Sequence, residues 1–316
     1  MRPMTRADAT RLNDFLAVVE AVDRTGEHYN TDDVLEELDS PLTDPSTDWV
    51  LAEIDGEIVG HWRLFPRAVN DGEQSVTLDG AVHPDRRGQG IGSLLVTDMV
   101  TRGLAYVRER DDAVRAVLTA SGMSTNTDQA ELFTAAGLKP HRWSVQMEAT
   151  TTGEIAAADA VPEGLVIESY TDADADALRE AHNLAFLDHP DFTPWDEPMW
   201  QQWVTGTRNF RPGLSFLVRD EAGAIAAYLQ TNEYDAIFES TGRKEAYVAK
   251  VGTLRGHRGK GLASILLRHA LASYQAAGFD RASLDVDSQN PTGALGVYER
   301  AGFSATNRWT NYRLEG

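Results

Sequence analysis

Residues 254–267 read LRGHRGKGLASILL, a basic, glycine-rich turn followed directly by an apolar run. The apolar residues Leu262, Ile265 and Leu266 recur at helical spacing, and the preceding AYVAKVGTL (246–254) reads as a strand. A helix that starts after a glycine turn exposes unpaired backbone N–H groups, and its dipole adds partial positive charge there. The stretch therefore predicts an anion-binding turn between a strand and a helix, in a mixed α/β domain.

This basic turn lies in a strongly acidic chain. The 316 residues include 29 Lys and Arg against 49 Asp and Glu, which gives a formal charge of −20. Nucleic acids and anionic membranes require a basic protein face, so we expect neither as a partner. No apolar run reaches the roughly 18 residues that span a bilayer, and the N-terminal residues lack a secretion signal, so we expect a cytoplasmic protein.

Cysteine is absent from the sequence. Disulfides, zinc–thiolate sites and cysteinyl intermediates are therefore excluded. The histidines show no ligand spacing, and we expect no metal.

The same landmarks occur twice along the chain, in the same order. A Thr cap before a helical pattern, a glycine turn before a helix, an aromatic helix and a final strand each have two copies. The pairs are TRADATRLNDF (5–15) and TDADADALREA (171–181), RRGQGIGSLLV (86–96) and HRGKGLASILL (257–267), AELFTAAGL (130–138) and LGVYERAGF (295–303), and RWSVQM (142–147) and RWTNYR (308–313). The sequence therefore predicts a duplicated domain.

Each half has the predicted order helix, strand, strand, strand, helix, strand, helix, strand, with a hairpin around Asp55-Gly56 and another around Ala222-Gly223. The segment between the halves is small, polar and contains Pro and Gly, as linkers do. We expect an N-terminal domain at 1–150, a linker at 151–164 with the boundary near residue 155, and a C-terminal domain at 165–316.

Two common phosphate-binding turns do not fit the glycine pattern. A P-loop requires four residues between its first Gly and a Gly-Lys-Ser/Thr, which neither copy has. A Rossmann turn requires G-x-G-x-x-G, but GQGIGS (88–93) has its third glycine one place early. What remains is Arg-x-x-Gly-x-Gly/Ala, at Arg87, Gly90 and Gly92 in the first half and at Arg258, Gly261 and Ala263 in the second.

Together these features resemble the GNAT superfamily of N-acetyltransferases, whose pyrophosphate-binding motif is Q/R-x-x-G-x-G/A after a central strand. The resemblance covers almost the whole chain and is nearest in layout to the tandem-domain members, a group that includes mycothiol synthase. VDSQNPTGALGVYERAGF (286–303) stands at the expected distance downstream. The resemblance implies two tandem α/β domains, each a central mixed β-sheet flanked by helices, and acetyl-CoA as co-substrate.

In that family the turn amides hold the pyrophosphate of acetyl-CoA, and the preceding strand pairs with its pantetheine arm. The resemblance therefore implies cofactor-binding residues in the second half at Val251, Gly252, Thr253, Arg258, Gly259, Lys260, Gly261, Leu262 and Ala263. The matching residues of the first half are Gly80, Ala81, Val82, Arg87, Gly88, Gln89, Gly90, Ile91 and Gly92. For each turn the alternative is a glycine-rich connection without a ligand.

Acetyl transfer to an amine requires that the amine lose a proton and that the leaving thiolate gain one. In related enzymes a tyrosine of the following helix often donates to the CoA sulfur, and Tyr298 has that position, whereas Phe133 matches it in the first half. The resemblance implies that the second half is catalytic, with Tyr298 as general acid. The alternative role for Tyr298 is a core aromatic. Asn290 resembles a family asparagine that contacts the cofactor, and a turn residue before Pro291 is its alternative.

The general base of such a reaction is often a carboxylate near the central strands in this family. Glu245 and Glu233 are the candidates, with solvated strand-edge charges as the alternative. Lys250, beside the pantetheine segment, could orient an anionic group of a substrate.

The stretch FLDHPDFTPWDEPMWQQW (186–203) corresponds to a region that commonly lies over the acceptor site in this family. The resemblance implies that Trp195 and Trp200 form a pocket wall and that Asp196 attracts an ammonium group, although Trp200 and Trp203 are also spaced as helix core. We expect a small-molecule amine as acceptor, and a monomer or homodimer. The alternative function is a non-catalytic acyl-CoA-binding sensor or assembly module with the same fold.

Overall fold

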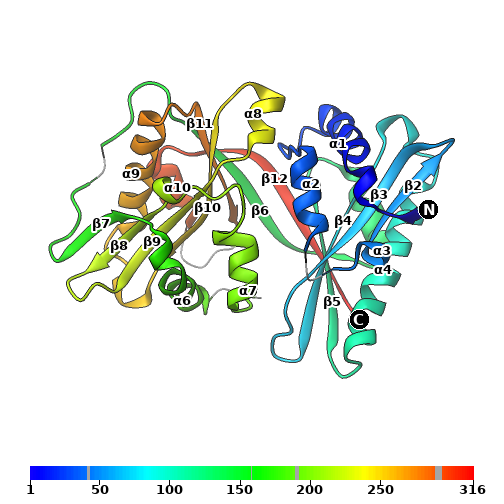
Figure 1. Ribbon diagram of the computed structural model, residues 1–316, viewed down its shortest axis with the longest axis horizontal. Helices are drawn as coiled ribbons and strands as arrows, with labels where there is room; N and C mark the ends of the chain where they lie inside the picture. The colour runs from blue at the N-terminus through cyan, green and yellow to red at the C-terminus, as the bar shows by residue number, and fades with distance from the viewer. Residues whose placement is uncertain (41–42, 158, 189–191, 289–293) are drawn as a thin grey trace. The chain divides into compact units, whose positions relative to one another are not determined.

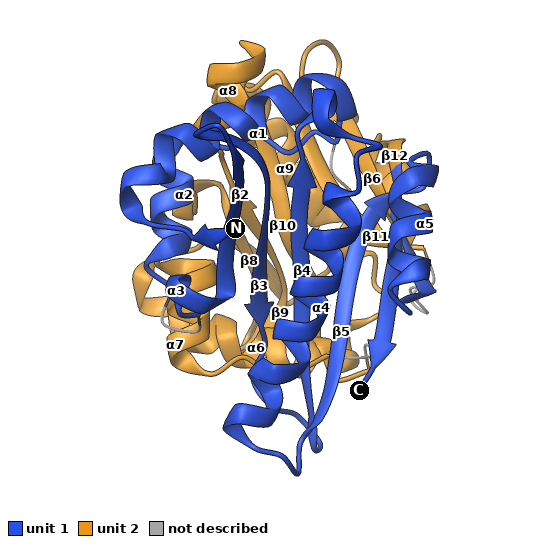
Figure 2. Cartoon of the chain, turned by 90° about the vertical axis from the view of Figure 1, so that its right-hand side faces the viewer, with its two compact units in different colours: residues 1–144, 308–316 blue, residues 145–307 orange. Residues whose placement is uncertain are grey.

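The computed structural model of the chain describes residues 1–40, 43–157, 159–188, 192–288 and 294–316. Packing divides the chain into two compact units (Figure 2), residues 1–144 with 308–316 as unit 1 and residues 145–307 as unit 2. Each unit is a mixed β-sheet with helices on its faces (Figure 1), which confirms the predicted fold class. Among the described helices, none is long and apolar enough to cross a membrane.

Unit 1 follows the predicted order of elements, with a short first strand and two extra short helices. Its sheet has the strand order β1-β2-β3-β4-β5-β12, in which only β4 and β5 are parallel neighbours. The elements are β1 (Arg2–Pro3), α1 (Ala9–Asp23), α2 (Thr31–Leu38), α3 (Pro45–Asp48), β2 (Trp49–Ile54), β3 (Glu57–Pro66), β4 (Glu73–Val82), α4 (Ile91–Arg110), β5 (Arg115–Met123), α5 (Thr127–Ala135) and β6 (Lys139–Thr150).

Unit 2 has the same order with two α-helices instead of three before its hairpin, and it adds a helix, α8, between the strands that correspond to β3 and β4. Its sheet has the order β6-β11-β10-β9-β8-β7, in which β10 and β11 are parallel. The elements are β7 (Leu165–Ser169), α6 (Ala175–Phe186), α7 (Glu197–Trp200), β8 (Phe216–Asp220), β9 (Ile225–Asn232), α8 (Asp235–Thr241), β10 (Glu245–Thr253), α9 (Leu262–Ala276), β11 (Arg281–Asp287), α10 (Ala294–Ala301) and β12 (Ser304–Glu315).

The helices of unit 2 lie on two faces of its sheet (Figure 1). The larger core lies under α9 and α10 and includes Val248 of β10, Leu284 of β11 and Leu266 of α9. A second, aromatic core lies under α6 and α7 and includes Tyr228 and Trp200. Side chains alternate along a strand, so each strand of unit 2 gives one row to each face.

The last strands of the two sequence halves are shared between the units. Residues 309–315 of β12 pair antiparallel with β5 and belong to unit 1. Residues 145–150 of β6 belong to unit 2, where Val145 and Met147 are in its core. The compact units therefore differ from the sequence repeats at their ends, and the expected boundary between the repeats at 151–164 stays a prediction.

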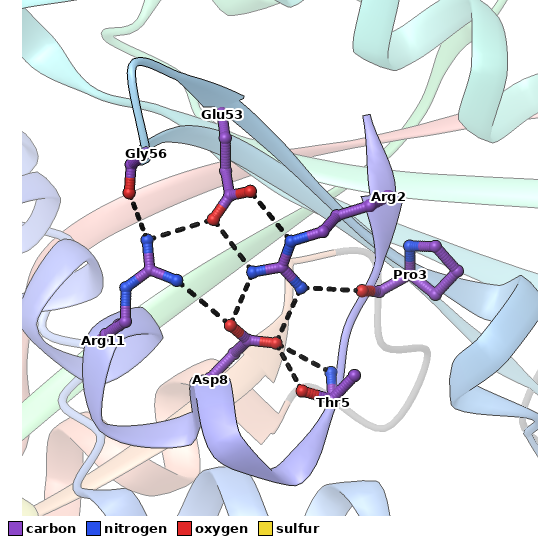
Figure 3. A network of polar contacts seen from close by, with 7 residues as sticks. All are labelled: Arg2, Pro3, Thr5, Asp8, Arg11, Glu53 and Gly56. Carbon is purple, nitrogen blue, oxygen red and sulfur yellow. Dashed lines mark hydrogen bonds and ion pairs between the residues drawn. The ribbon is translucent and has the colours of Figure 1, made fainter.

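Local sequence signals explain how the first helix of each unit begins. Thr5 and Asp8 form a capping box before α1, and Thr171 and Asp174 form the same box before α6. In unit 1 the box extends into a network of charges (Figure 3). Arg2 bonds both Asp8 and Glu53, at 2.6 Å and 2.8 Å, and so ties the first residues of the chain to β2.

Candidate functional site

The two parallel strands of unit 2 separate soon after they meet. β10 and β11 are in register only from Glu245 to Tyr247, opposite 281–283, although both strands continue for several residues. β10 also contains a bulge against β9, because its register shifts between Val248 and Lys250. A bulge bends the strand and increases its twist. Beyond Tyr247, the edge of β10 toward β11 is therefore open for another chain-like molecule to pair with.

The open strand leads into the predicted turn. Gly259 and Gly261 both have φ of 77°, a left-handed conformation that favours glycine. From Gly259 to Ser264, no backbone N–H donates to a protein acceptor in the described part of the chain, and the first helical bond comes from Ile265 to the carbonyl of Gly261. Consecutive unbonded donors at the start of a helix suit an anion, since the helix dipole adds positive potential there, and the binding of an anion at this turn stays a prediction.

Arg258 fixes the shape of this turn. Its guanidinium donates to the carbonyl oxygens of Thr253 and Ala185, at 3.2 Å and 2.9 Å, and pairs with Asp188 at 2.9 Å. Arg255 bonds the same carboxylate, and the hydrogen bonds from Arg258 and Arg255 hold the pKa of Asp188 below its usual range. The Arg258 side chain thus ties the turn to the end of α6, while the backbone amides remain available.

Unit 1 contains the same turn. Gly88 and Gly90 have φ of 71° and 83°, and Arg87 donates to the carbonyl of Val82 and pairs with Asp23 at the end of α1. Its strands are different, because β4 stays in register with β5 from Glu73 to Leu78 and pairs with β3 without a register shift. The anion turn is therefore duplicated, but the bulge and the early separation occur in unit 2.

Tyr298 and Phe133 occupy matching positions in α10 and α5. In each helix the carbonyl of this residue accepts the N–H of the residue five places on, Phe303 or Leu138, at 3.0 Å. Phe133 is buried against Tyr312, with ring centroids 5.1 Å apart. Tyr298 packs on the α9 core, and burial raises the pKa of its phenol to about 12. At neutral pH Tyr298 is therefore protonated and able to donate.

Gly252 is required by the close approach of a neighbouring ring. A Cβ atom at this position would lie 2.3 Å from Cε1 of Tyr228, which is fully buried on β9. The Tyr228 hydroxyl is 2.6 Å from Nδ1 of His182 on α6. Burial and the charge of Lys250 lower the pKa of His182 to about 3, so this imidazole is neutral.

The aromatic residues expected over the acceptor site pack around His182. Trp195 and Trp200 have ring centroids 6.2 Å and 5.2 Å from its ring, and the Lys250 ammonium lies 4.9 Å from the Trp195 ring. Trp200 is 2% exposed and belongs to the core under α6. Asp196 caps α7 by accepting the N–H of Met199 at 2.9 Å. Their contact with a substrate stays a prediction.

The two carboxylates expected as bases each have cationic partners. Glu245 is buried, accepts a hydrogen bond from Ser283 and pairs with Arg281 at 2.5 Å. Glu233 pairs with Arg211 at 2.7 Å and with Lys244 at 3.5 Å. A role as base stays a prediction for both.

The remaining cofactor candidates lie along the two strands and turns. In unit 2, Val251 packs on the α9 core and Leu262 is buried in it. In unit 1, a Cβ at Gly80 would lie 2.6 Å from the carbonyl oxygen of His61, and a Cβ at Gly92 would lie 2.9 Å from Leu132. Asn290 lies outside the described residues. The other candidates lie at the ends of β10 and β4 (Thr253 and Ala81), in the turns (Lys260 and Gln89) and in the first turns of α9 and α4 (Ala263 and Ile91), and their contact with a cofactor stays a prediction.

The sequence analysis missed a polar row on β11. Arg281, Ser283 and Asp285 alternate with the buried Ala282, Leu284 and Val286, so they lie on the face opposite α9. Tyr247 of β10 donates to Asp285 at 3.0 Å. The alternation in RASLDVDS (281–288) was the available signal, because a half-buried strand exposes its polar row.

The chain is similar to known proteins over most of its length. The sequence model of the Acetyltransferase (GNAT) family matches the chain twice, at residues 15–138 and 175–303. A protein from Streptomyces scabiei named mycothiol acetyltransferase is 30% identical over 275 residues, 84% of this chain and 79% of that protein. A mycothiol acetyltransferase from Nocardia farcinica is 28% identical over 276 residues, 84% of this chain and 82% of its own length.

Solved structures agree over the full chain. A GCN5-related N-acetyltransferase from Sphaerobacter thermophilus is 25% identical with a TM-score of 0.77, and the match covers 99% of this chain and 94% of that one. A tandem GNAT protein from the clavulanic acid biosynthesis pathway has a TM-score of 0.70 at 19% identity, with 99% and 97% coverage, and shares the fold. With both halves matched by the family model, this chain belongs to the GNAT family of acetyltransferases.

Proposed function

We propose that the chain is an acetyl-CoA-dependent N-acetyltransferase that moves the acetyl group to a primary amine of a small molecule, and that unit 2 carries the reaction. The observation behind this proposal is the open edge of β10, which leads directly into a turn of unbonded amides. Unit 2 combines this path with Tyr298, whereas unit 1 has Phe133 at the matching position.

The residues present fit acetyl-CoA. The diphosphate would accept hydrogen bonds from the amides of the turn at Gly259–Ala263, which need an anionic partner. The pantetheine arm, which carries amide groups, would pair with β10 at Val251–Thr253 as an added strand does. Lys260 adds positive charge beside the phosphates, with its Nζ 3.4 Å from Nδ1 of His257.

Bound in this way, the thioester reaches the point where β10 and β11 separate. Family membership implies that the acceptor amine attacks the thioester carbonyl directly, within a ternary complex, and a chain without cysteine suits this route. The carbon–sulfur bond breaks, and Tyr298 donates its proton to the sulfur. Burial raises the pKa of the Tyr298 phenol to about 12, so the hydroxyl keeps its proton at neutral pH and is present as a hydrogen-bond donor to the developing thiolate.

Unit 1 then has a structural or a binding role. On the face opposite α4, Arg63 is buried, pairs with Asp79 at 2.7 Å and also bonds Glu37. These charged side chains pair with one another next to Leu78, the last residue of β4 that is in register with β5. We expect the enzyme in the cytoplasm, with the small-molecule amine and acetyl-CoA as its substrates.

The proposal is tested by thiol release from acetyl-CoA. The purified chain is incubated with acetyl-CoA and a panel of amino acids, amino sugars and polyamines, and free CoA thiol is measured. We expect amine-dependent thiol release with at least one class, and the acetylated amine by mass spectrometry. Acetyl-CoA binding by calorimetry without release for any amine would contradict catalysis and support a binding module.

A further inference from the structure

Unit 2 has a polar face beside the point where β10 and β11 separate. On the side opposite α9, three strands contribute polar side chains, connected in part by hydrogen bonds. The row includes Gln230 and Asn232 on β9, Glu245, Tyr247 and Lys250 on β10, and Arg281, Ser283 and Asp285 on β11. An amine that attacks a thioester in the gap between the strands can approach from this face, since the opposite face is filled by the α9 core.

The carboxylates near this face are not equivalent. Arg281 neutralises Glu245, and Arg211 neutralises Glu233. Asp285 has no cation within salt-bridge distance among the described residues, and its hydrogen-bond partner is the neutral hydroxyl of Tyr247 at 3.0 Å. Asp285 is also exposed, as a group that meets a substrate must be. It is the carboxylate here that an incoming cation can pair with.

A buried acceptor on the same face points to a ligand. Gln230 is 1% exposed, and its Oε1 has no hydrogen-bond donor among the described residues. Its Nε2 donates to Asn232, which in turn donates to Tyr234, whose ring packs on that of Tyr247. Buried polar atoms are almost always satisfied, so a molecule bound on this face is expected to bring a donor to Gln230.

We propose that Asp285 binds the ammonium group of the acceptor and takes its proton before the attack on the thioester. This inference rests on the acetyl transfer proposed for unit 2 and adds the residue that activates the amine. The inference also limits the class of acceptor. The acceptor is a small amine with a second N–H or O–H group that donates a hydrogen bond to Oε1 of Gln230. Tyr247 is a positioning residue, because it acts through its hydrogen bond to Asp285.

The protons balance in this scheme. Asp285 takes the first proton of the ammonium group and later releases it to solvent, the net proton of the reaction. The free amine forms the C–N bond, and the C–S bond breaks as Tyr298 protonates the sulfur. The second nitrogen proton then restores the Tyr298 hydroxyl.

The environment of Asp285 suits this task. Neighbouring protein atoms that displace water from one side of the carboxylate raise its pKa, the Tyr247 hydrogen bond lowers it, and the negative charge of Glu245 raises it further. A base whose pKa is above that of an ordinary aspartate holds a proton more firmly near neutral pH. The charged and titratable groups on this face are Glu245, Tyr247, Lys250, Arg281, Asp287 and Tyr234.

Unit 1 provides an internal comparison. An Arg–Glu pair, Arg115 with Glu73, begins its parallel register, as Arg281 with Glu245 does in unit 2. The residue that corresponds to Asp285 is Thr119, whose hydroxyl bonds that of Thr77 at 3.1 Å. The Glu–Arg pair is common to both units, whereas the unpaired carboxylate belongs to the unit with Tyr298.

The test uses the full chain with acetyl-CoA and an amine that the wild type accepts. We expect Asp285→Asn to lower kcat/KM for the amine about 100-fold or more, the typical contribution of a proton-transferring group. The melting temperature and the calorimetric affinity for acetyl-CoA should not change. Asp285→Glu should restore part of the rate, because it keeps the carboxylate.

The pH profile of kcat/KM separates catalysis from a structural effect. Tyr247→Phe removes the hydrogen bond that lowers the Asp285 pKa, so the acid limb should move to higher pH. Glu245→Gln removes the negative charge that raises this pKa, so the limb should move to lower pH. Opposite shifts from two neighbours of one carboxylate would identify that carboxylate as the titrating base.

Two results would overturn the inference. One is an Asp285→Asn variant with wild-type kcat/KM and an unchanged acid limb. The other is loss of the acid limb in Glu245→Gln alone, which would make Glu245 the base. If the wild type itself releases no thiol with any amine, the proposed function fails first, and the inference falls with it.

Discussion

The two repeats have different residues at the position expected beside the sulfur of CoA. The second repeat has Tyr298 there, and the first has Phe133. Phe133 keeps the same backbone hydrogen bond as Tyr298, but its ring has no proton to give. Replacement of Tyr298 by phenylalanine therefore removes the proton donor and keeps the aromatic ring.

We predict that Tyr298→Phe lowers kcat about 100-fold, because the thiolate then leaves without a proton donor. The affinity for acetyl-CoA should stay the same, since the ring remains on the α9 core. Steady-state thiol release and calorimetry measure the two quantities. Tyr312→Phe, which removes a phenol hydroxyl from unit 1, is the matched control. Wild-type turnover in Tyr298→Phe would exclude the general-acid role.

A second prediction for a single residue concerns Asp8 and the pH dependence of folding stability. Its carboxylate accepts from Arg2 and Thr5 and pairs with Arg11 (Figure 3), and the bonds from Arg2 and Thr5 hold its pKa well below the usual range. A depressed pKa in the folded state adds stability above the ordinary aspartate pKa, and this stability is lost as the pH falls through the folded value.

We therefore expect Asp8→Asn to lower the free energy of unfolding by about 1–3 kcal/mol at neutral pH, the usual cost of breaking a buried charged hydrogen bond. The difference from the wild type should shrink as the pH falls below about 4. Urea unfolding at several pH values measures it. The exposed Asp112→Asn is the control, and a difference that grows in acid would contradict the assignment.

At the scale of elements, the two glycine turns are close copies with different strands before them. Gly261 and Gly90 both precede their helices with a left-handed φ, and a Cβ on either would meet no atom within 4 Å. A leucine at either site thus carries the same backbone cost, about 1–2 kcal/mol, and projects into the space beside the amides.

We predict that Gly261→Leu abolishes turnover and acetyl-CoA binding at the active site, whereas Gly90→Leu leaves turnover largely intact. The shared backbone cost makes each variant the control for the other. Calorimetry and thiol release on both variants measure the effect. The reverse result would place the reaction in unit 1.

Most of the fold was predictable at this scale because its signals are local. The glycine turns, the two hairpins and the capping boxes each need only neighbouring residues, and all are present in the structure. The bulge in β10 was not predictable, because Ala249 has no distinctive chemistry and the register depends on β9.

Contacts between residues that are far apart in the sequence could not be predicted. The repeated Arg-Trp pairs at 142–143 and 308–309 suggested one alignment of the last strands of the two repeats. The pattern of buried residues shifts this alignment by one residue, because Val145 matches Thr310 and Met147 matches Tyr312. The partners of Glu245 and Asp285 come from positions tens of residues apart in the chain. A carboxylate can be recognised in a sequence, but its neutralising partner cannot.

At the scale of the whole molecule, the last residues of the chain complete the first unit. Residues 309–315 of β12 pair with β5, and Tyr312 is buried against Phe133. Unit 1 therefore cannot finish folding until residues 308–316 have been synthesised, and its stability depends on a segment that follows unit 2 in the sequence.

We predict that Tyr312→Ala destabilises unit 1 by about 3–5 kcal/mol, the usual cost of removing a buried aromatic side chain. Hydrogen exchange should show faster exchange of the β5 amides at Val117–Met123, with β9 of unit 2 unchanged. Thr306→Ala, at an exposed position of β12 within unit 2, is the control. Unchanged protection of β5 would contradict the shared-strand arrangement.

The central claim is that unit 2 holds acetyl-CoA with its thioester beside Tyr298, and a crystal structure of the chain grown with excess acetyl-CoA tests it most directly. We predict the diphosphate on the amides of Gly259–Ala263, the pantetheine along Val251–Thr253, and the sulfur within hydrogen-bond distance of the Tyr298 hydroxyl. A turn in unit 2 that stays empty, or a cofactor bound in unit 1 alone, would contradict the account.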